Sequence, residues 1–304
     1  MKNSFLIDNN NINSRLDRWF KRNVFNAPQS LIEKHIRKGN IKINKKIEKS
    51  SYKLKKNDKI FIYNINFIPD QNKKKTNLYI PSKKELDKSE RIFIEDNENF
   101  VVLNKPQGIA VQPGTKSRRN ILDILRKTKE FNSTSPYIVH RIDKETSGIL
   151  IVAKNRKYAQ LFTSLFRIRK IHKTYLGIVI GEFKDKEGVY TDELFHYEGK
   201  KKIITKAITY YKVIDANNNF TLIKLNPKTG RKHQLRKQLL IHGHPIIGDE
   251  KYRILTKYNP KKQTLMLHSY KINFLINNIK YNFVAKPPLN FTKFLAEKNL
   301  KIPL

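Results

Sequence analysis

The sequence predicts an α+β protein with a mostly antiparallel mixed sheet, preceded by a small module of helices and strands. After residue 91, β-prone stretches outnumber helical ones and follow one another directly, as in paired antiparallel strands. Between residues 69 and 90, lysines, two prolines and few apolar side chains give the composition of a linker. We therefore expect a first domain at 1–68, a basic linker at 69–90 and a larger domain at 91–304.

The composition favours a soluble, cytoplasmic protein that binds a polyanion. The chain holds 63 lysines and arginines against 26 aspartates and glutamates, a formal net charge of +37. Nucleic acid is the natural partner of such a chain, although abundant Lys, Asn and Ile can also reflect a biased genome. The absence of cysteine excludes disulfides and thiol catalysis, and the eight histidines lack metal-ligand spacing. We expect no metal, no membrane span, no secretory signal and a monomer.

The sequence of the first domain predicts two helices followed by short strands. Ser14 is followed three residues later by Asp17, and Ser30 by Glu33, a spacing typical of helix N-termini. Gly39 is placed to end the second helix. We expect helices that begin near Ser14 and span 30–38, and strands at 5–7, 41–43 and 59–65.

Basic side chains lie on or near these two predicted helices, which suggests a small RNA-binding module. The alternative is that they form an ordinary solvated face. The candidate RNA contacts include Arg15, Arg37 and Lys38.

The larger domain begins with a predicted hairpin and continues as strands with few helices. Asn120 and Asn155 are placed to cap two helices. Inward-facing apolar side chains are expected along the second of these helices. The expected elements are strands at 91–95, 100–103, 188–196, 203–214 and 219–226, and helices at about 120–127, at 155–167 and after 229.

Residues 136–154 are the stretch around which the domain is organised. Two apolar, β-prone segments, 137–139 and 149–153, enclose a polar turn that contains Arg141 and Asp143. A charged turn between two strands of a rigid scaffold is a position where a catalytic group can be held. From the residues alone, a β-turn in which Asp143 binds the local backbone is an equal alternative.

The segment His-Arg-Ile-Asp-x-x-Thr-Ser-Gly-Ile-Leu at residues 140–150 closely resembles the catalytic motif of the RluA-type pseudouridine synthases. The resemblance implies the pseudouridine-synthase fold and makes Asp143 the essential catalytic residue. Residues 1–68 resemble the alpha-L RNA-binding domain of ribosomal proteins and of many members of this family. This N-terminal module is most similar to that of the large-subunit ribosomal RNA enzymes of RluC type.

Further segments resemble other motifs of the family. Lys173 and Tyr175 match its second motif, which implies that Tyr175 lies near the flipped base. Arg236, in the segment 229–236, matches the arginine that pairs with the catalytic aspartate. Gln112 and Gln238 stand where many members have histidine, so the roles of those side chains do not carry over.

The resemblance implies a cofactor-independent isomerase that converts uridines to pseudouridine in large-subunit (23S) ribosomal RNA. Its implied catalytic residues are Asp143, Tyr175 and Arg236. Arg141, Lys173 and Arg231 are expected to contact RNA, and His140 and His233 are expected to be structural. Two alternatives stay open: a non-catalytic ribosome assembly factor on the same scaffold, which would be expected to have lost Asp143, and an unrelated RNA enzyme. Against the second alternative, the sequence lacks the clustered metal-binding carboxylates of a nuclease and the Gly-rich cofactor loop of a methyltransferase.

Overall fold

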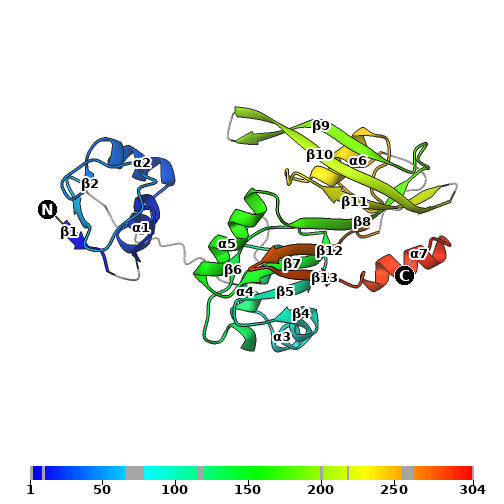
Figure 1. Cartoon of the computed structure of the whole chain (residues 1–304), viewed down its shortest axis with the longest axis horizontal. Helices are drawn as coiled ribbons and strands as arrows, with labels where there is room; N and C mark the ends of the chain where they lie inside the picture. Colours follow the sequence, from blue (N-terminus) through cyan, green and yellow to red (C-terminus); the bar gives the residue numbers. More distant parts are fainter. Residues whose placement is uncertain are drawn as a thin grey trace. The chain divides into compact units, whose positions relative to one another are not determined.

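A computed structural model describes residues 3–8, 11–65, 79–114, 119–198, 201–217, 219–254 and 263–302. The chain divides into two compact units, Met1–Thr76 and Asn77–Leu304 (Figure 1). Each unit has hydrophobic clusters of its own. Among the described residues, no helix combines the length and the apolar character that a membrane span requires.

The first unit packs two helices against one face of a three-stranded antiparallel sheet. Strand β3 lies between β1 and β2. The core between helices and sheet contains Trp19 and Phe20 from the first helix, Ile36 from the second and Ile60 from β3. The elements are β1 (Asn3–Leu6), α1 (Leu16–Asn23), α2 (Gln29–Arg37), β2 (Ile41–Ile43) and β3 (Lys59–Ile62).

The two helices lie where the sequence predicts them, but each begins one or two residues away from the expected start. The residue before α1 is Arg15 and the residue before α2 is Pro28, and neither makes a side-chain cap hydrogen bond. The Asp17 carboxylate accepts hydrogen bonds from the side chains of Arg15 and Gln29 instead. Proline restricts the backbone in the way that a helix start requires, so α2 begins one residue before Ser30.

The second half of the predicted linker is part of the second unit, which corrects the boundary at residue 90. Residues 69–78 lie outside the described residues. From Tyr79 onward the chain packs against the second unit, because Tyr79 and Leu86 join one of its hydrophobic clusters. The Tyr79 amide also donates to Asp123. Helix α3 (Lys83–Ser89) and the short 3-10 helix η2 (Glu90–Ile92) form within this segment.

The second unit is built on a ten-stranded mixed sheet, which confirms the predicted α+β class. Its order is β4-β5-β7-β12-β8-β11-β10-β9, with β13 beside β12 and β6 beside β7. The pairings are antiparallel except for that of β7 with β12. The strands are β4 (Phe93–Asp96), β5 (Phe100–Lys105), β6 (Tyr137–Ile138), β7 (Ser147–Ala153), β8 (His172–Ile180), β9 (Glu187–Glu198), β10 (Lys201–Ala216), β11 (Phe220–Pro227), β12 (Leu267–Ile276) and β13 (Ile279–Val284).

Helices cover parts of this sheet and place the loops that form the site. Asn120 and Asn155 cap α4 and α5 as predicted, each accepting a hydrogen bond from the backbone three residues on. Phe162 of α5 is fully buried against the sheet. In Figure 1, α6 lies beside the long β9–β10 hairpin. The remaining elements are α4 (Ile121–Leu125), η3 (Lys129–Phe131), α5 (Arg156–Arg167), α6 (Gln234–Ile241) and α7 (Leu289–Glu297).

Candidate active site

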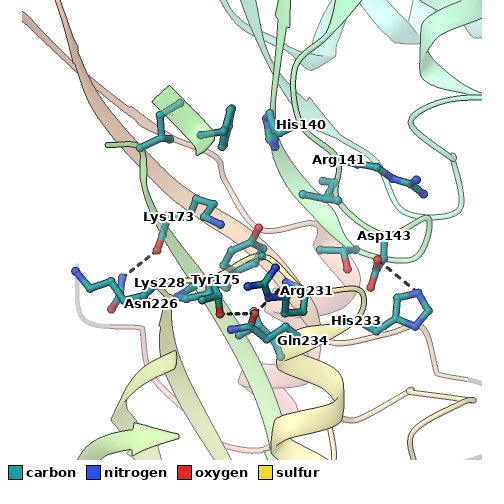
Figure 2. A pocket seen from close by; sticks show the side chains of 18 of the residues that line it. His140, Arg141, Asp143, Lys173, Tyr175, Asn226, Lys228, Arg231, His233 and Gln234 are labelled. Carbon is teal, nitrogen blue, oxygen red and sulfur yellow. Dashed lines mark hydrogen bonds and ion pairs between the residues drawn. The ribbon is translucent and has the colours of Figure 1, made fainter. Parts of the chain in front are cut away.

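A cleft of about 820 Å³ lies between the loop that connects β6 to β7, the start of β8 and the loop that connects β11 to α6. The first of these loops carries Asp143, and β8 carries Tyr175 (Figure 2). Arg236 enters from the first turn of α6. The three residues that the sequence predicts as catalytic therefore line one cleft, although 93 positions separate the first from the last in the chain.

Asp143 is partly open to the cleft and is held from one side by Arg236. Its side chain is 30% exposed, and its Oδ2 accepts from Arg236 Nη1 at 3.4 Å. The predicted pairing of these two residues is present, with a longer contact than a tight ion pair makes. Arg236 thus places a positive charge beside a carboxylate that is still accessible from the cleft.

Arg236 is itself fixed by a second carboxylate, that of Asp249. The two groups make a bidentate pair, with Nε to Oδ2 at 2.6 Å and Nη2 to Oδ1 at 2.7 Å. Burial alone would lower the pKa of Arg236, but its hydrogen bonds to Asp249 raise it overall, so the guanidinium stays charged. Asp249 also accepts from the backbone amides of Lys251 and Tyr252. The guanidinium of Arg236 is thus fixed in one orientation, in which Nη1 is available to Asp143.

His233 contacts the other oxygen of Asp143, a contact that the sequence does not indicate (Figure 2). Its Nε2 lies 3.7 Å from Oδ1, and its Nδ1 is hydrogen bonded to the hydroxyl of Tyr252. Burial lowers the pKa of His233, although the charge of Asp143 acts in the opposite direction. A neutral imidazole follows near pH 7, so this contact orients the carboxylate without neutralising it. His233 adopts φ of +54° directly before α6, and its side chain lines the cleft.

The loop of Asp143 is supported from behind by a buried lysine. Lys105 is fully buried, and its Nζ donates to the carbonyl oxygens of Pro106, Ile109 and Lys144 at 2.7, 2.9 and 3.1 Å. Burial lowers the pKa of Lys105 to about 7. Three acceptors match the three N–H groups of the ammonium form, so the charged form is the one that this pocket fits. Through Lys144, this contact holds the residue next to Asp143.

Strands β7 and β12 meet at unusually close range directly after this loop. Gly148 has φ of +104°, and a Cβ there would lie 2.2 Å from the carbonyl oxygen of Ser269. Only glycine fits this position. Beside it, Ser147 is hydrogen bonded to Nδ1 of the buried His268 at 2.9 Å. These contacts anchor the C-terminal end of the Asp143 loop to the sheet.

Tyr175 and Lys173 project from β8 on the wall of the cleft, and both groups are affected by burial. Burial raises the pKa of Tyr175 to about 12, an effect that the hydrogen bond with Ser269 partly opposes. The phenol is therefore protonated throughout the neutral range. Burial also lowers the pKa of Lys173.

His140, which also lines the cleft, is held by contacts with the backbone and with a neighbouring ring. Its Nε2 accepts the amide hydrogen of Ile151 at 2.8 Å, and its ring stacks on Phe166. Burial lowers the pKa of His140 to about 3, so the ring is neutral.

The remaining predicted contacts fall into two groups. In the second unit, Arg141 and Arg231 line the cleft with exposed side chains. In the first unit, Arg37 and Lys38 lie exposed at the end of α2, whereas the guanidinium of Arg15 is paired with Asp17 at 2.6 Å. A phosphate at Arg15 would have to compete with that carboxylate.

The two glutamines that replace a family histidine lie in different surroundings. Gln238 is fully buried and is hydrogen bonded to Thr209 at 2.6 Å and Asp192 at 2.7 Å. Its role is to satisfy polar groups between α6 and the sheet. Gln112 is exposed.

The fold and this cleft define an RNA-modifying enzyme, and comparison with known proteins agrees. Residues 99–240 match the family model described as RNA pseudouridylate synthase. The chain belongs to this family, and it is an isomerase that converts uridine to pseudouridine.

The most similar relatives include two proteins named ribosomal large subunit pseudouridine synthase C. One, from Buchnera aphidicola subsp. Schizaphis graminum, is 36% identical over 95% of each chain. The other, from Rickettsia conorii, is 33% identical over 95% of this chain and 98% of its own. Among solved structures, human RNA Pseudouridylate Synthase Domain Containing 4 matches with a TM-score of 0.63 at 25% identity, over 72% of this chain and 97% of its own. The predicted pseudouridine-synthase fold is confirmed.

Proposed function

We propose that the protein converts specific uridines of large-subunit (23S) ribosomal RNA to pseudouridine without a cofactor, with Asp143 as the catalytic residue. The observation that carries this proposal is the pairing of Asp143 with a cation whose orientation is fixed by Asp249, inside a cleft large enough for a base. Relatives named for the large ribosomal subunit cover 95% of the chain, which supports the choice of RNA. We also place the enzyme in the cytoplasm as a monomer.

The proposed reaction requires one carboxylate and a site that is sheltered from solvent. The bond between N1 of uracil and C1′ of ribose breaks, the base turns, and C5 bonds to C1′. C5 then loses its proton to solvent and N1, freed from the sugar, takes up a proton, so the product is an isomer of the substrate. The ionised Asp143 acts either on the sugar carbon or on a sugar proton. In both cases the target base must leave its stack to reach the cleft.

The cations around the cleft are proposed to hold the flipped nucleotide in place. Lys173 and Arg231 contact backbone phosphates, and Arg141 fills the space that the base leaves. In the first unit, which we assign as an alpha-L RNA-binding domain, Arg15, Arg37 and Lys38 contact RNA outside the target nucleotide. Phosphate contacts of this kind set register and affinity rather than sequence preference.

The direct test uses the purified chain and a 23S ribosomal RNA transcript labelled with tritium at C5 of uracil. Release of tritium, followed by mapping of the modified positions, is the expected result. No release from this transcript, with release from another RNA class, would refute the assignment to ribosomal RNA while leaving the family unaffected.

The alternative to this proposed function is a non-catalytic ribosome assembly factor on the same scaffold. A protein that only binds RNA has no need to keep an aspartate, an arginine and a second aspartate in one aligned chain of contacts. The presence of Asp143, Arg236 and Asp249 in that arrangement favours catalysis.

Substitutions of Tyr175 test its proposed stacking on the base. Tyr175→Phe keeps the ring and is expected to lower kcat about tenfold, whereas Tyr175→Ala loses stacking as well and is expected to lower it about 100-fold or more. Because the pKa of Tyr175 is raised to about 12, the phenol does not ionise between pH 6 and 9. The ratio of wild-type to Tyr175→Phe rates should therefore stay constant over that range. Single-turnover tritium release measures both effects, and equal rates for the two variants would argue against stacking.

Removal of residues 1–76 tests the assignment of the first unit to RNA binding. The cleft lies wholly in the second unit, which has a core of its own, so the truncated enzyme should still convert uridine in short RNA at low salt. The deletion removes 19 of the 63 lysines and arginines, and the slope of log affinity against log salt should become shallower. Binding and turnover are measured at two salt concentrations. A folded truncation with no activity under any condition would mean that the first unit completes the active site.

A further inference from the structure

The outer face of the small sheet in the first unit carries two aromatic rings that the core does not use. Along β3, Ile60 and Ile62 point into the core, so Lys59, Phe61 and Tyr63 point the other way. Tyr63 follows the strand and stays in register, because its amide donates to the carbonyl of Asn40. Among the described residues of the first unit, the hydrophobic core includes neither Phe61 nor Tyr63.

The two rings lie in nearly parallel planes with a lysine over each. Their centroids are 6.4 Å apart with an interplanar angle of 15°. Lys59 Nζ lies 5.6 Å from the centre of the Phe61 ring, and Lys42 Nζ lies 5.5 Å from the centre of the Tyr63 ring. The ring planes are thus ordered by contacts on this face itself.

Strand pairing completes this surface. Because β3 is the central strand, Phe61 stands between Ser4 of β1 and Lys42 of β2. Leu6 pairs with Lys59 and is 69% exposed. We define the outer sheet face by these residues: Ser4, Leu6, Lys42, Lys59, Phe61 and Tyr63.

We propose that the outer sheet face binds an unpaired segment of RNA, with bases on Phe61 and Tyr63 and phosphates on Lys42 and Lys59. Aromatic rings on a sheet with cations beside them are the usual means of holding single-stranded nucleic acid, because every base has a face that can stack. The six residues include no acidic side chain, and residues 1–65 contain 16 lysines and arginines against five aspartates and glutamates. A positively charged surface of this kind fits RNA better than it fits a typical protein partner.

This surface is distinct from the helix residues to which RNA contact is already assigned. Helices α1 and α2 share a core with the inner side of the sheet, where Ile60 and Ile62 point, whereas the outer sheet face lies on the opposite side. The first unit would therefore contact RNA on two sides, with phosphate contacts near the helices and base stacking on the sheet. The inference rests on the proposed function only in taking RNA as the substrate.

The experiment measures binding of the full-length chain to a fluorescein-labelled ten-nucleotide oligouridine and to a blunt RNA duplex. Phe61→Ala should weaken binding to the single strand about tenfold and binding to the duplex less than twofold. Phe61→Tyr keeps the stack and should bind within twofold of wild type. Phe61→Leu keeps an apolar side chain without a ring, and should lose as much affinity as the alanine variant. Ile47→Ala is the matched control, since Ile47 is 56% exposed in the same unit but lies outside this face.

Salt dependence separates stacking from charge. Phe61→Ala should leave the slope of log affinity against log salt unchanged, whereas Lys42→Ala should reduce its magnitude by about one. Ultraviolet crosslinking of the wild-type chain to the oligouridine should give an adduct on Phe61 or Tyr63.

Three results would overturn the proposal. These are single-strand affinity within twofold of wild type for a folded Phe61→Leu variant, an equal loss in Ile47→Ala, or adducts confined to residues outside the outer sheet face. Turnover of a short RNA that reaches only the cleft should be the same in all of these variants. If the wild-type chain produced no pseudouridine, the proposed function would fail while the binding results would still decide this inference.

Discussion

Asp143→Asn is expected to abolish pseudouridine formation, with a fall in rate on the order of 10⁴-fold or more, the scale on which removal of a catalytic side chain acts. Asparagine has nearly the same shape, so the Arg236–Asp249 pair and the cleft should stay intact. What is lost is the negative charge that either role at the sugar requires. Single-turnover tritium release from C5-labelled RNA gives the rate.

Affinity measured on the same RNA separates chemistry from binding. The variant should bind RNA within a few-fold of wild type, because the contacts proposed for Lys173 and Arg231 do not depend on Asp143. Asp185→Asn, at an exposed loop position, is a matched control that should keep full activity. Turnover by Asp143→Asn within tenfold of wild type would reject the catalytic assignment.

The elements that follow from local rules could be predicted from the sequence. Asn120 and Asn155 satisfy backbone amides three residues on, a rule that involves neighbours only. The strands at 187–198, 201–216 and 220–227 have β-prone patterns that their pairings confirm. The helix starts differ from the expected ones by one or two residues, since Arg15 precedes α1 and Pro28 precedes α2. Local spacing does not show partners from farther along the chain, such as Gln29 for Asp17, 12 positions away.

The prediction of a linker at 69–90 differs from the structure from Tyr79 onward, for a related reason. Its second half is polar on average, yet two of its apolar side chains, Tyr79 and Leu86, join a hydrophobic cluster of the second unit. Composition averaged over 22 positions does not show where two such anchors lie. The surface that receives these side chains is formed by residues between 101 and 152, which lie outside the segment.

The pairing of Asp143 with Arg236 was implied by resemblance alone, and the groups that support it were not predicted. Lys105 is the last residue of β5, but nothing in its neighbours indicates that its Nζ reaches the carbonyl of Lys144, 39 positions away. The contact between the His233 ring and the carboxylate of Asp143 was not predicted either. These contacts depend on how β5, the Asp143 loop and α6 meet, which only the assembled sheet determines.

Asp249→Ala is expected to lower both stability and activity by large amounts. The substitution leaves the guanidinium of Arg236 buried without its bidentate partner, and the amides of Lys251 and Tyr252 lose an acceptor. Breaking a buried charge pair in this way costs about 3–5 kcal/mol of unfolding free energy. Turnover should fall about 100-fold even where the variant is folded, because the fork of Arg236 is then free to turn away from Asp143.

A double variant distinguishes the positioning role of Asp249 from a merely structural one. Asp249→Ala combined with Arg236→Met removes the unpaired charge, so it should recover much of the lost stability, since an apolar pair in place of a buried ion pair is often neutral or better. It should not recover turnover, because the cation beside Asp143 is gone. Urea unfolding measures the first quantity and tritium release the second, at a temperature where every variant is folded. Recovery of activity together with stability would mean that Arg236 is needed only for folding, and that Asp143 works without a partner.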